Sequence, residues 1–89
     1  MRIISGSHKR RKIVPPKNLE LRPTTDIAKE AVFNIIENRY IIANKSMLDL
    51  FSGTGNIAFE FASRGTKDVV AIDKNKDCIN FINKTAKNF

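Results

Sequence analysis

Two short apolar runs, each associated with an aspartate, most constrain how this chain can fold. The first is Met47 to Phe51, which contains Asp49, and the second is Val69 to Asp73. Between them lie a glycine loop, Ser52 to Gly55, and a helical segment that ends near Gly65. This order of strand, helix and strand indicates a right-handed parallel crossover, the unit of α/β proteins. The first run is predicted to be a strand buried on both faces.

A longer helix is predicted before the first run. Thr24, Thr25 and Asp26 are N-cap candidates, and the apolar spacing predicts a helix over Asp26–Arg39. Its predicted buried face is an apolar stripe made of Ile27, Ala28, Ala31, Val32, Ile35 and Ile36. The helix after the glycine loop is expected to bury Ile57, Ala58, Phe61 and Ala62. A third helix is expected after the second run.

Positive charge is concentrated at the N-terminal end of the chain. Residues 1–22 contain seven Lys or Arg and one acid, whereas residues 23–89 contain nine and eight. Two β-prone runs, Arg2 to Ser5 and Lys9 to Val14, flank Gly6-Ser7 and predict a basic β-hairpin that projects from the body. We therefore expect a hairpin and connector over 1–22 that docks RNA, and an α/β domain over 23–89.

The basic cluster of this hairpin consists of Lys9, Arg10, Arg11 and Lys12. A run of charges is often only a solvated face, but here the excess is confined to one segment, which favours contact with RNA. The segment holds few aromatic side chains that could stack on bases. We therefore expect contact with phosphates rather than base reading.

The loop between the first strand and its helix is the predicted ligand site. Gly53 and Gly55 let a ligand approach the backbone, where free helix N–H groups can meet an anion. Asp73 lies 20 residues after Gly53, at the end of the neighbouring strand, where a carboxylate can accept the hydroxyls of a ribose. Asp49 and Asp73 are therefore expected to face one nucleoside ligand.

Two cofactors fit such a loop. The spacing Gly53-x-Gly55-x-x-Ala58 also satisfies the dinucleotide fingerprint, so a nicotinamide or flavin enzyme stays open. Asp49 favours the other cofactor, because a carboxylate repels a pyrophosphate but attracts the sulfonium and amino groups of S-adenosylmethionine. The simplest alternative is a Gly-x-Gly turn that binds no ligand.

The remaining chemistry-bearing residues give little support to other kinds of site. The single cysteine, Cys78, rules out an internal disulfide, fits a reducing compartment and is expected in the core. The single histidine, His8, has no partner that would form a catalytic base, and it is expected in an exposed loop. No metal site is predicted. No apolar run reaches the roughly 18 residues of a membrane helix, so we expect a cytoplasmic protein with no membrane partner.

Six stretches, in order along nearly the whole chain, resemble one bacterial family. They are Arg2-Ile-Ile-Ser-Gly6, Arg11-Lys-Ile13, Arg22-Pro-Thr-Thr-Asp26, Lys29-Glu-Ala-Val-Phe-Asn34, Asp49-Leu-Phe-Ser-Gly-Thr-Gly55 and Ser63-Arg-Gly65. Together they resemble the small-subunit ribosomal RNA guanine-N2 methyltransferase family. One departure is Arg10, which stands where family members usually carry glycine before Arg-Lys, and which bears on the backbone of the hairpin.

The resemblance implies a class I methyltransferase with a Rossmann-like fold, of which this chain would carry the N-terminal half. Such an enzyme moves a methyl group from S-adenosylmethionine to the exocyclic amine of one guanine in 16S rRNA, within a partly assembled small subunit. The family's catalytic motif, Asp or Asn followed by Pro-Pro and an aromatic residue, does not occur in the sequence. We therefore assign no catalytic residue and expect the chain to be inactive by itself.

The resemblance also implies a set of cofactor-binding residues. They are Asp49, Phe51, Ser52, Gly53 and Gly55 on the methionine side, Asp73 at the ribose, Lys74 and Asn75 beside the adenosine, and Arg22 and Thr24 closing the site. A half domain would leave Met47 to Phe51 as an exposed strand edge, through which we expect the chain to self-associate. Two other interpretations stay open: a basic RNA-binding module with a vestigial cofactor pocket, and a fragment of a dinucleotide-dependent enzyme.

Overall fold

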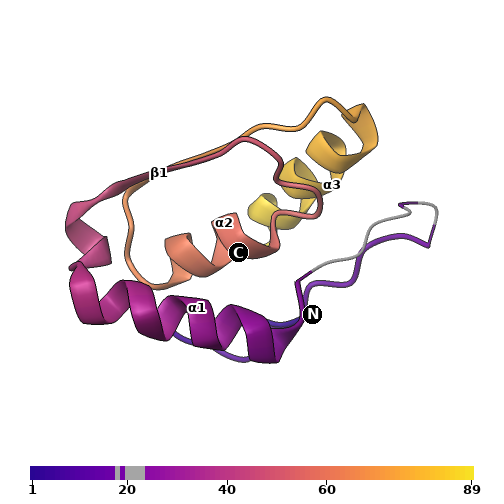
Figure 1. Cartoon of the computed structure of the whole chain (residues 1–89). Coiled ribbons are helices and arrows are strands. Elements are labelled where there is room, and N and C mark those ends of the chain that lie inside the picture. The colour runs from indigo at the N-terminus through magenta and orange to yellow at the C-terminus, as the bar shows by residue number, and fades with distance from the viewer. Residues whose placement is uncertain (18, 20–23) are drawn as a thin grey trace.

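The computed structural model describes residues 1–17, 19 and 24–89. Its elements in chain order are α1 (Asp26–Arg39), the short 3-10 helix η1 (Ile42–Asn44), β1 (Ser46–Asp49), α2 (Asn56–Ser63), β2 (Asp68–Ala71) and α3 (Lys76–Lys87), as Figure 1 shows. This arrangement confirms a small α/β unit with three α-helices, and the predicted bounds of α1 are correct. None of the helices in the described ranges is long and apolar enough to cross a membrane.

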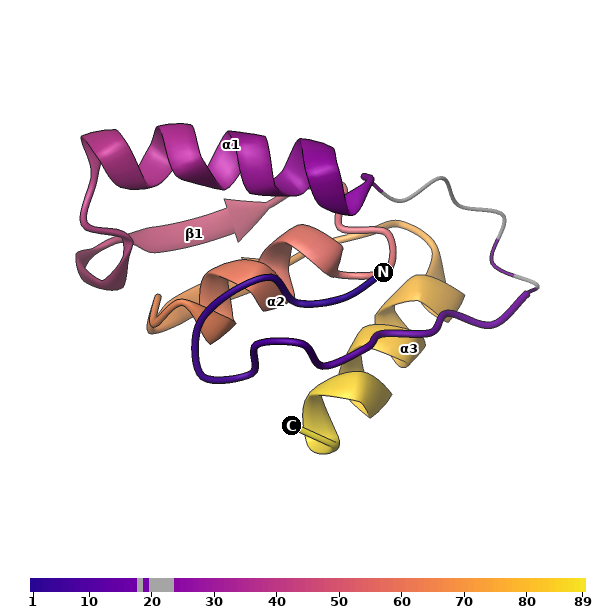
Figure 2. The same cartoon turned by 90° about the horizontal axis from the view of Figure 1, so that it is seen from below.

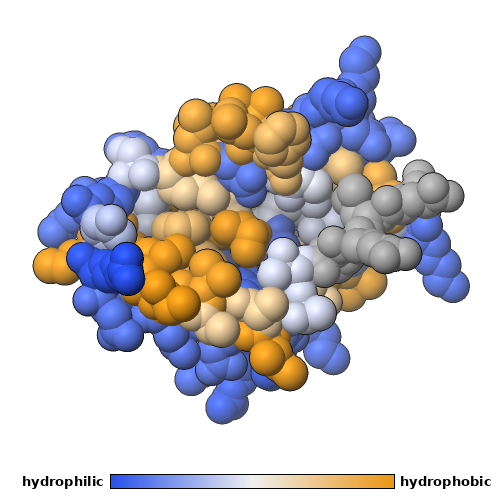
Figure 3. All heavy atoms as spheres, in the orientation of Figure 1, coloured by the Kyte–Doolittle hydropathy of each residue, from blue (hydrophilic) through white to orange (hydrophobic). Residues whose placement is uncertain are grey.

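The two strands pair in parallel, in a register that joins Ser46 to Asp68 and Asp49 to Ala71. Both are shorter than predicted. Met47 and Asp49 turn toward the interior and are half-buried, whereas Leu48 on the other face is 59% exposed. The prediction that this strand is buried on both faces is therefore wrong, because the described helices cover only one side of the sheet. Hydrophobic surface gathers over the strands and over α1 in Figure 3.

Helix α1 presents a different face to the interior from the one that its apolar spacing predicts. Its buried residues are Lys29 and Phe33, whereas Ile27, at 82% exposed, and Ile35, at 58% exposed, lie on the surface. The Phe33 ring packs against Phe61 of α2, with ring centres 4.7 Å apart. The helix is therefore oriented by its contacts with α2, in which a lysine and an aromatic ring outweigh the apolar stripe.

The interior face of α2 also differs from the predicted one. Ala58 is buried as predicted, but Ala62 is exposed, and Phe59 and Glu60 are buried instead. Phe59 is buried because it packs against the N-terminal hairpin, and Glu60 because it pairs with a charge on α1. The local pattern of apolar residues predicts neither contact.

The N-terminal segment turns back on itself as a hairpin closed by a single antiparallel bridge between Arg2 and Lys12, without the two predicted strands, and it does not project from the body. Backbone bonds join Ile3 N–H to Arg11 C=O at 2.9 Å and Ile13 N–H to Met1 C=O at 3.0 Å. Ile3 and Ile13 are each 1% exposed and form the hydrophobic core with Phe59. Figure 2 shows the hairpin running across α2 and then beside α3. The expectation of a projecting hairpin is therefore wrong, since its apolar side chains are part of the core.

The tip of the hairpin docks on the end of α2 through a close backbone approach. Ser7 N–H donates to Ser63 C=O at 2.8 Å, and the Ser63 hydroxyl donates to Ser5 C=O at 2.7 Å. Gly6 has a φ of +93°, and a Cβ at this position would lie 1.9 Å from the Ser63 carbonyl oxygen. Glycine is therefore required here both by its backbone angle and by its neighbour.

A buried ion cluster ties the hairpin and the first two α-helices together. We use this name for Lys29, Glu60 and Arg64. Lys29 Nζ lies 3.2 Å from Glu60 Oε1, and both side chains are 0% exposed. Arg64 Nε lies 2.7 Å from Glu60 Oε2. The same carboxylate accepts hydrogen bonds from the hairpin amides of Ile4, at 2.8 Å, and Ser5, at 3.1 Å.

The carboxylate of Glu60 is held in its charged form. Burial by itself would raise its pKa, but the hydrogen bonds from Ile4, Arg64 and Lys29 outweigh burial and lower the pKa below the ordinary value of 4.5. A carboxyl group whose pKa is lower in the folded state stabilises the fold above its unfolded-state pKa. That contribution is lost as the pH falls through the folded-state pKa.

Replacing Glu60 with Gln should therefore destabilise the chain strongly at neutral pH. The variant leaves the Lys29 ammonium buried without its counter-charge, which costs about 3 to 5 kcal/mol when one partner of a buried pair is removed. Urea unfolding at pH 7 measures this loss of unfolding free energy. Below the ordinary pKa of 4.5 the difference in unfolding free energy between the wild type and the variant should become smaller, because the wild-type carboxyl then becomes protonated.

The matched control is Glu37→Gln, which makes the same change on another partner of Arg64. Glu37 Oε1 lies 3.2 Å from Arg64 Nη1, but its side chain is 45% exposed. Exposed pairs contribute at most about 1 kcal/mol. If the two variants lost equal amounts of unfolding free energy, the assigned role of Glu60 would be contradicted.

Candidate functional site

The glycine loop lies at the carboxyl ends of both strands, as predicted. Its turn is closed by a 2.8 Å bond from Gly55 N–H to Ser52 C=O. Gly53 and Gly55 have positive φ angles of 55° and 83°. Gly55 also serves as the N-cap of α2, where no side chain caps the helix. The loop therefore brings the first amides of α2 to the sheet end where α/β proteins bind their ligands.

Asp73 links this loop to the end of β2. Its Oδ2 accepts a hydrogen bond from Gly53 N–H at 2.9 Å, and its Oδ1 accepts one from Asn75 N–H at 2.9 Å. The bond from Asn75 and then the bond from Gly53 lower the pKa of this carboxyl below its usual value of 3.8. Asp73 is therefore ionised at neutral pH. A carboxylate has about four acceptor positions, so two amide bonds leave room for ligand hydroxyls.

A single pocket of about 620 Å³ gathers most of the predicted cofactor residues. Those that line it are Thr24, Asp49, Phe51, Ser52, Gly53 and Asp73. Its volume lies in the range of small-molecule sites, which is about 300 to 1,000 Å³. The two aspartates therefore face the same pocket, and the 89% exposed ring of Phe51 stands at its rim.

Three of the predicted cofactor residues, Gly55, Lys74 and Asn75, do not line this pocket. The space where a Cβ of Gly55 would lie faces the interior, 2.9 Å from the Phe59 ring and 3.0 Å from Ile82. Gly55 therefore also permits the close packing of α2 on α3. Lys74 and Asn75 are exposed beside Asp73, and Asn75 caps α3 by accepting a bond from Asp77 N–H at 2.9 Å. Arg22 lies outside the described residues.

Two polar residues of the pocket wall, Thr54 and Asn56, were not among the predicted cofactor residues. Asn56, the first residue of α2, lines the pocket and is only 4% exposed. Its Nδ2 donates to Thr24 C=O at 3.1 Å, and its Oδ1 accepts from Lys29 Nζ at 2.7 Å. For Asn56 the available signal was a polar residue at the first position of the helix, but its partners lie too far along the chain to be identified from spacing.

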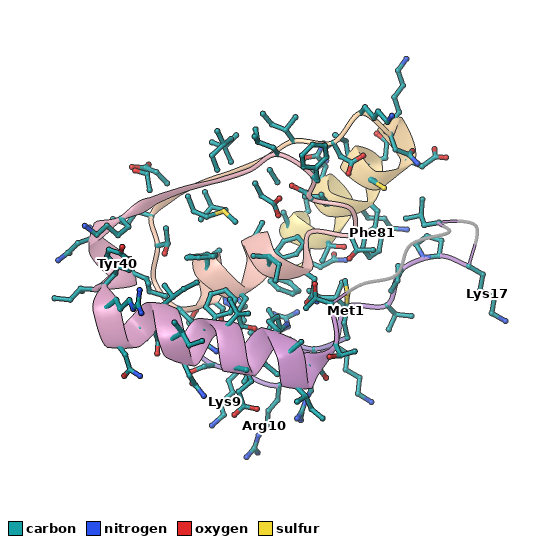
Figure 4. All side chains as sticks on the ribbon, viewed as in Figure 1. Met1, Lys9, Arg10, Lys17, Tyr40 and Phe81 are labelled. Atoms are coloured by element: carbon teal, nitrogen blue, oxygen red, sulfur yellow. The ribbon has the colours of Figure 1, made fainter. Side chains whose placement is uncertain are left out.

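The basic cluster of the hairpin is divided between two hollows. Lys9 and Arg10 line one of about 410 Å³, which also contains Arg2 and Arg64 and is bordered by acidic residues of α1. Figure 4 shows Lys9 and Arg10 beside α1. Arg11 and Lys12 line a second hollow of about 580 Å³ beside α3. The four residues therefore do not form one continuous face.

Arg11 is also tied to the end of the chain. Its Nη2 donates to Asn88 C=O at 2.9 Å, and its guanidinium carbon lies 4.5 Å from the centre of the Phe89 ring. The His8 ring stacks on the same aromatic ring, with centres 5.0 Å apart. His8 is therefore half-buried, and the expectation of an exposed loop histidine is wrong.

No other centre of reactive side chains is evident in the part of the chain that the structure describes. Within it, no three His, Cys, Asp or Glu side chains gather in a way that could hold a metal ion. Cys78 is fully buried on α3, as predicted, and burial is the main reason why the pKa of its thiol is raised, followed by the charges of Asp73 and Asp77.

Comparisons with known proteins agree with this geometry. The family model described as "Conserved hypothetical protein 95" matches residues 1–89. A Buchnera aphidicola protein named "Ribosomal RNA small subunit methyltransferase D" is 37% identical over 84 residues, which are 94% of this chain and 42% of that protein. A Rickettsia prowazekii protein named "Uncharacterized methylase RP545" is 40% identical over 79 residues, which are 82% of this chain and 34% of that protein.

A solved structure also matches the fold. The Escherichia coli protein named "Putative methyltransferase yhhF" superposes with a TM-score of 0.82 at 27% identity, over 99% of this chain and 46% of that one. This chain therefore spans less than half the length of these three proteins. Because the family model matches every residue, the chain belongs to the conserved hypothetical protein 95 family, and its resemblance to the small-subunit rRNA methyltransferases is confirmed.

Proposed function

We propose that this chain carries the cofactor-binding part of an S-adenosylmethionine-dependent rRNA methyltransferase. The proposed reaction of the whole protein is methyl transfer to the exocyclic N2 amine of guanine 966 in 16S rRNA. The observation that carries the proposal is one pocket in which the glycine loop lies between two strand-end carboxylates, Asp49 and Asp73. The partner would be rRNA in a partly assembled small subunit, which implies a cytoplasmic protein.

The charge of the pocket favours the methyl donor over a dinucleotide. Asp49 lies in the pocket wall, where its carboxylate would attract a sulfonium and an amino group and would repel a pyrophosphate. In this proposal Asp49, Phe51, Ser52 and Gly53 contact the methionine part, and Thr24 and Arg22 close the site. Asp73 accepts the ribose hydroxyls, and Lys74 and Asn75 border the adenosine. Gly55 contributes the turn that aims the loop.

Calorimetric titration tests this assignment of the cofactor. S-adenosylhomocysteine, the demethylated product, should bind more tightly than NAD, and Asp73→Ala should weaken its binding by about 1.5 to 3 kcal/mol, the usual contribution of hydrogen bonds to a charged group. Asp68→Ala is the matched control, because it removes an exposed carboxylate at the opposite end of the same strand. Tighter binding of NAD, or equal losses for the two variants, would reject the proposal.

We further propose that the hairpin contacts RNA phosphates on two sides, through Lys9 and Arg10 beside α1 and through Arg11 and Lys12 beside α3. If about three of the four touch phosphates, replacing all four with Ala should flatten the plot of log K against log salt by about 2 to 3 units. Filter binding to a 16S rRNA fragment measures this slope.

The control replaces Lys45 and Lys67 with Ala. Both are exposed near the amino ends of the strands, and their loss should leave the slope of log K against log salt unchanged. A fourfold variant with an unaltered slope would show that the basic cluster is only a solvated face. RNA binding without any binding of S-adenosylhomocysteine would favour the alternative, a basic RNA-binding module with a vestigial pocket.

The free edge of β1 is proposed to mediate self-association. β1 pairs only with β2 among the described strands, and Leu48, Leu50 and Phe51 are 55% exposed or more. Unpaired strand edges with apolar side chains are templates for pairing with another chain. We therefore expect dimers or larger species in light scattering, and fewer of them for Leu48→Glu. A monomer whose Leu48 and Leu50 amides resist hydrogen exchange would contradict this expectation.

A further inference from the structure

We propose that Lys29 and Asn56 are positioning residues that couple the docking of the hairpin to the shape of the glycine-loop pocket. Under this proposal, the affinity for the cofactor depends on whether the hairpin is seated on α2. The inference rests on the proposed function, because it concerns the same pocket and the same cofactor. It adds that two buried side chains, neither of which was expected to bind a ligand, link the RNA-facing segment to the cofactor site.

The pocket end of this link is the side-chain amide of Asn56. Lys29 is a donor only, so the oxygen of the Asn56 amide must face its ammonium group. The NH₂ group then faces the opposite direction and donates to Thr24 C=O. Both Thr24 and Asn56 line the pocket. Lys29 therefore determines which way the amide points, and the amide holds the Thr24 wall in place.

The hairpin end of the link is the ammonium group of Lys29. Besides Asn56, its Nζ donates to the carbonyl of Arg2 in the hairpin and pairs with Glu60. An ammonium has three donors, so these partners use all of them. Glu60 in turn accepts from the hairpin amides of Ile4 and Ser5. If the hairpin leaves α2, the buried ammonium loses one partner and Glu60 loses two.

Because Lys29 is buried, the loss of these hydrogen-bond partners changes the position of its ammonium group. Its side chain is 0% exposed while the hairpin is seated, so the departure of the hairpin changes both the partners and the solvation of the ammonium group and lets it rearrange. A rearranged ammonium no longer fixes the Asn56 amide, and the Thr24 wall is released. Coupling between two sites is reciprocal. RNA that holds the hairpin in place should therefore tighten cofactor binding by the same factor by which the cofactor tightens RNA binding.

A double-mutant cycle on the dissociation constant of S-adenosylhomocysteine tests this coupling. Asn56→Asp keeps the acceptor for Lys29 but loses the donor to Thr24, so it should weaken binding roughly tenfold, as expected for one hydrogen bond. Ser63→Ala acts at the other end of α2, where it removes the bonds to Ser5 C=O at 2.7 Å and from His8 N–H at 3.0 Å. It should weaken binding roughly fivefold in the wild type.

The decisive result is the effect of Ser63→Ala in the Asn56→Asp background. If Asn56 transmits the state of the hairpin, the second substitution should then leave the dissociation constant nearly unchanged, although it still lowers stability. Thr66→Val is the matched control. It removes another buried bond to a backbone carbonyl, from Thr66 Oγ1 to Ile42 at 2.8 Å, outside the pocket. This control should lower stability and leave affinity as it is.

The failures of the two proposals are distinguishable. A wild-type chain that does not bind S-adenosylhomocysteine would overturn the proposed function, and this inference with it. Wild-type binding together with strictly additive effects of Asn56→Asp and Ser63→Ala, or with an Asn56→Asp variant of unchanged affinity, would overturn the coupling alone.

Discussion

The buried ion pair between Lys29 and Glu60 is the interaction on which the rest of the structure depends. Two charges without access to water must each keep a partner, and together they engage α1, α2 and the hairpin. Such a pair need not add net stability compared with a well-packed apolar pair. In the observed arrangement of the three segments, the ammonium of Lys29 and the carboxylate of Glu60 both have hydrogen-bond partners. The pocket is assembled as a consequence of that arrangement.

Local signals predicted the elements of this fold well. Thr25 and Asp26 mark the start of α1, and the Thr25 hydroxyl does accept a bond from Ala28 N–H. The faces of the helices were not predictable in the same way. Spacing identifies an apolar stripe, but Lys29 and Phe33 are buried because of partners on α2 that lie far along the chain. The burial of the hairpin was missed for the same reason, since two isolated isoleucines in a basic segment do not indicate that the segment packs into the core.

The candidate site also combines residues that the sequence predicts with residues that depend on partners far along the chain. Asp49 and Asp73 could be identified from the sequence because a carboxylate at the end of an apolar strand needs a reason to be there. Asn56, which lies beside the predicted Thr24 in the pocket wall, could not, because its role depends on an amide whose orientation is determined by a lysine on another helix. The sequence therefore predicts the carboxylates of the candidate site better than it predicts the buried polar groups that support its wall.

Arg10 gives the hairpin a dynamic property. Its φ of 72° lies in the left-handed region, and it is the one non-glycine residue with a positive φ in the described ranges. Such a conformation costs a residue with a Cβ roughly 1 to 2 kcal/mol. The cost is relieved whenever the hairpin opens, so the open state is populated about 5 to 30 times more than it would be with a glycine there, apart from the extra freedom that glycine gives the open chain. The backbone angle of this one residue therefore raises the fraction of time for which the first residues of the chain are away from the surface of α2.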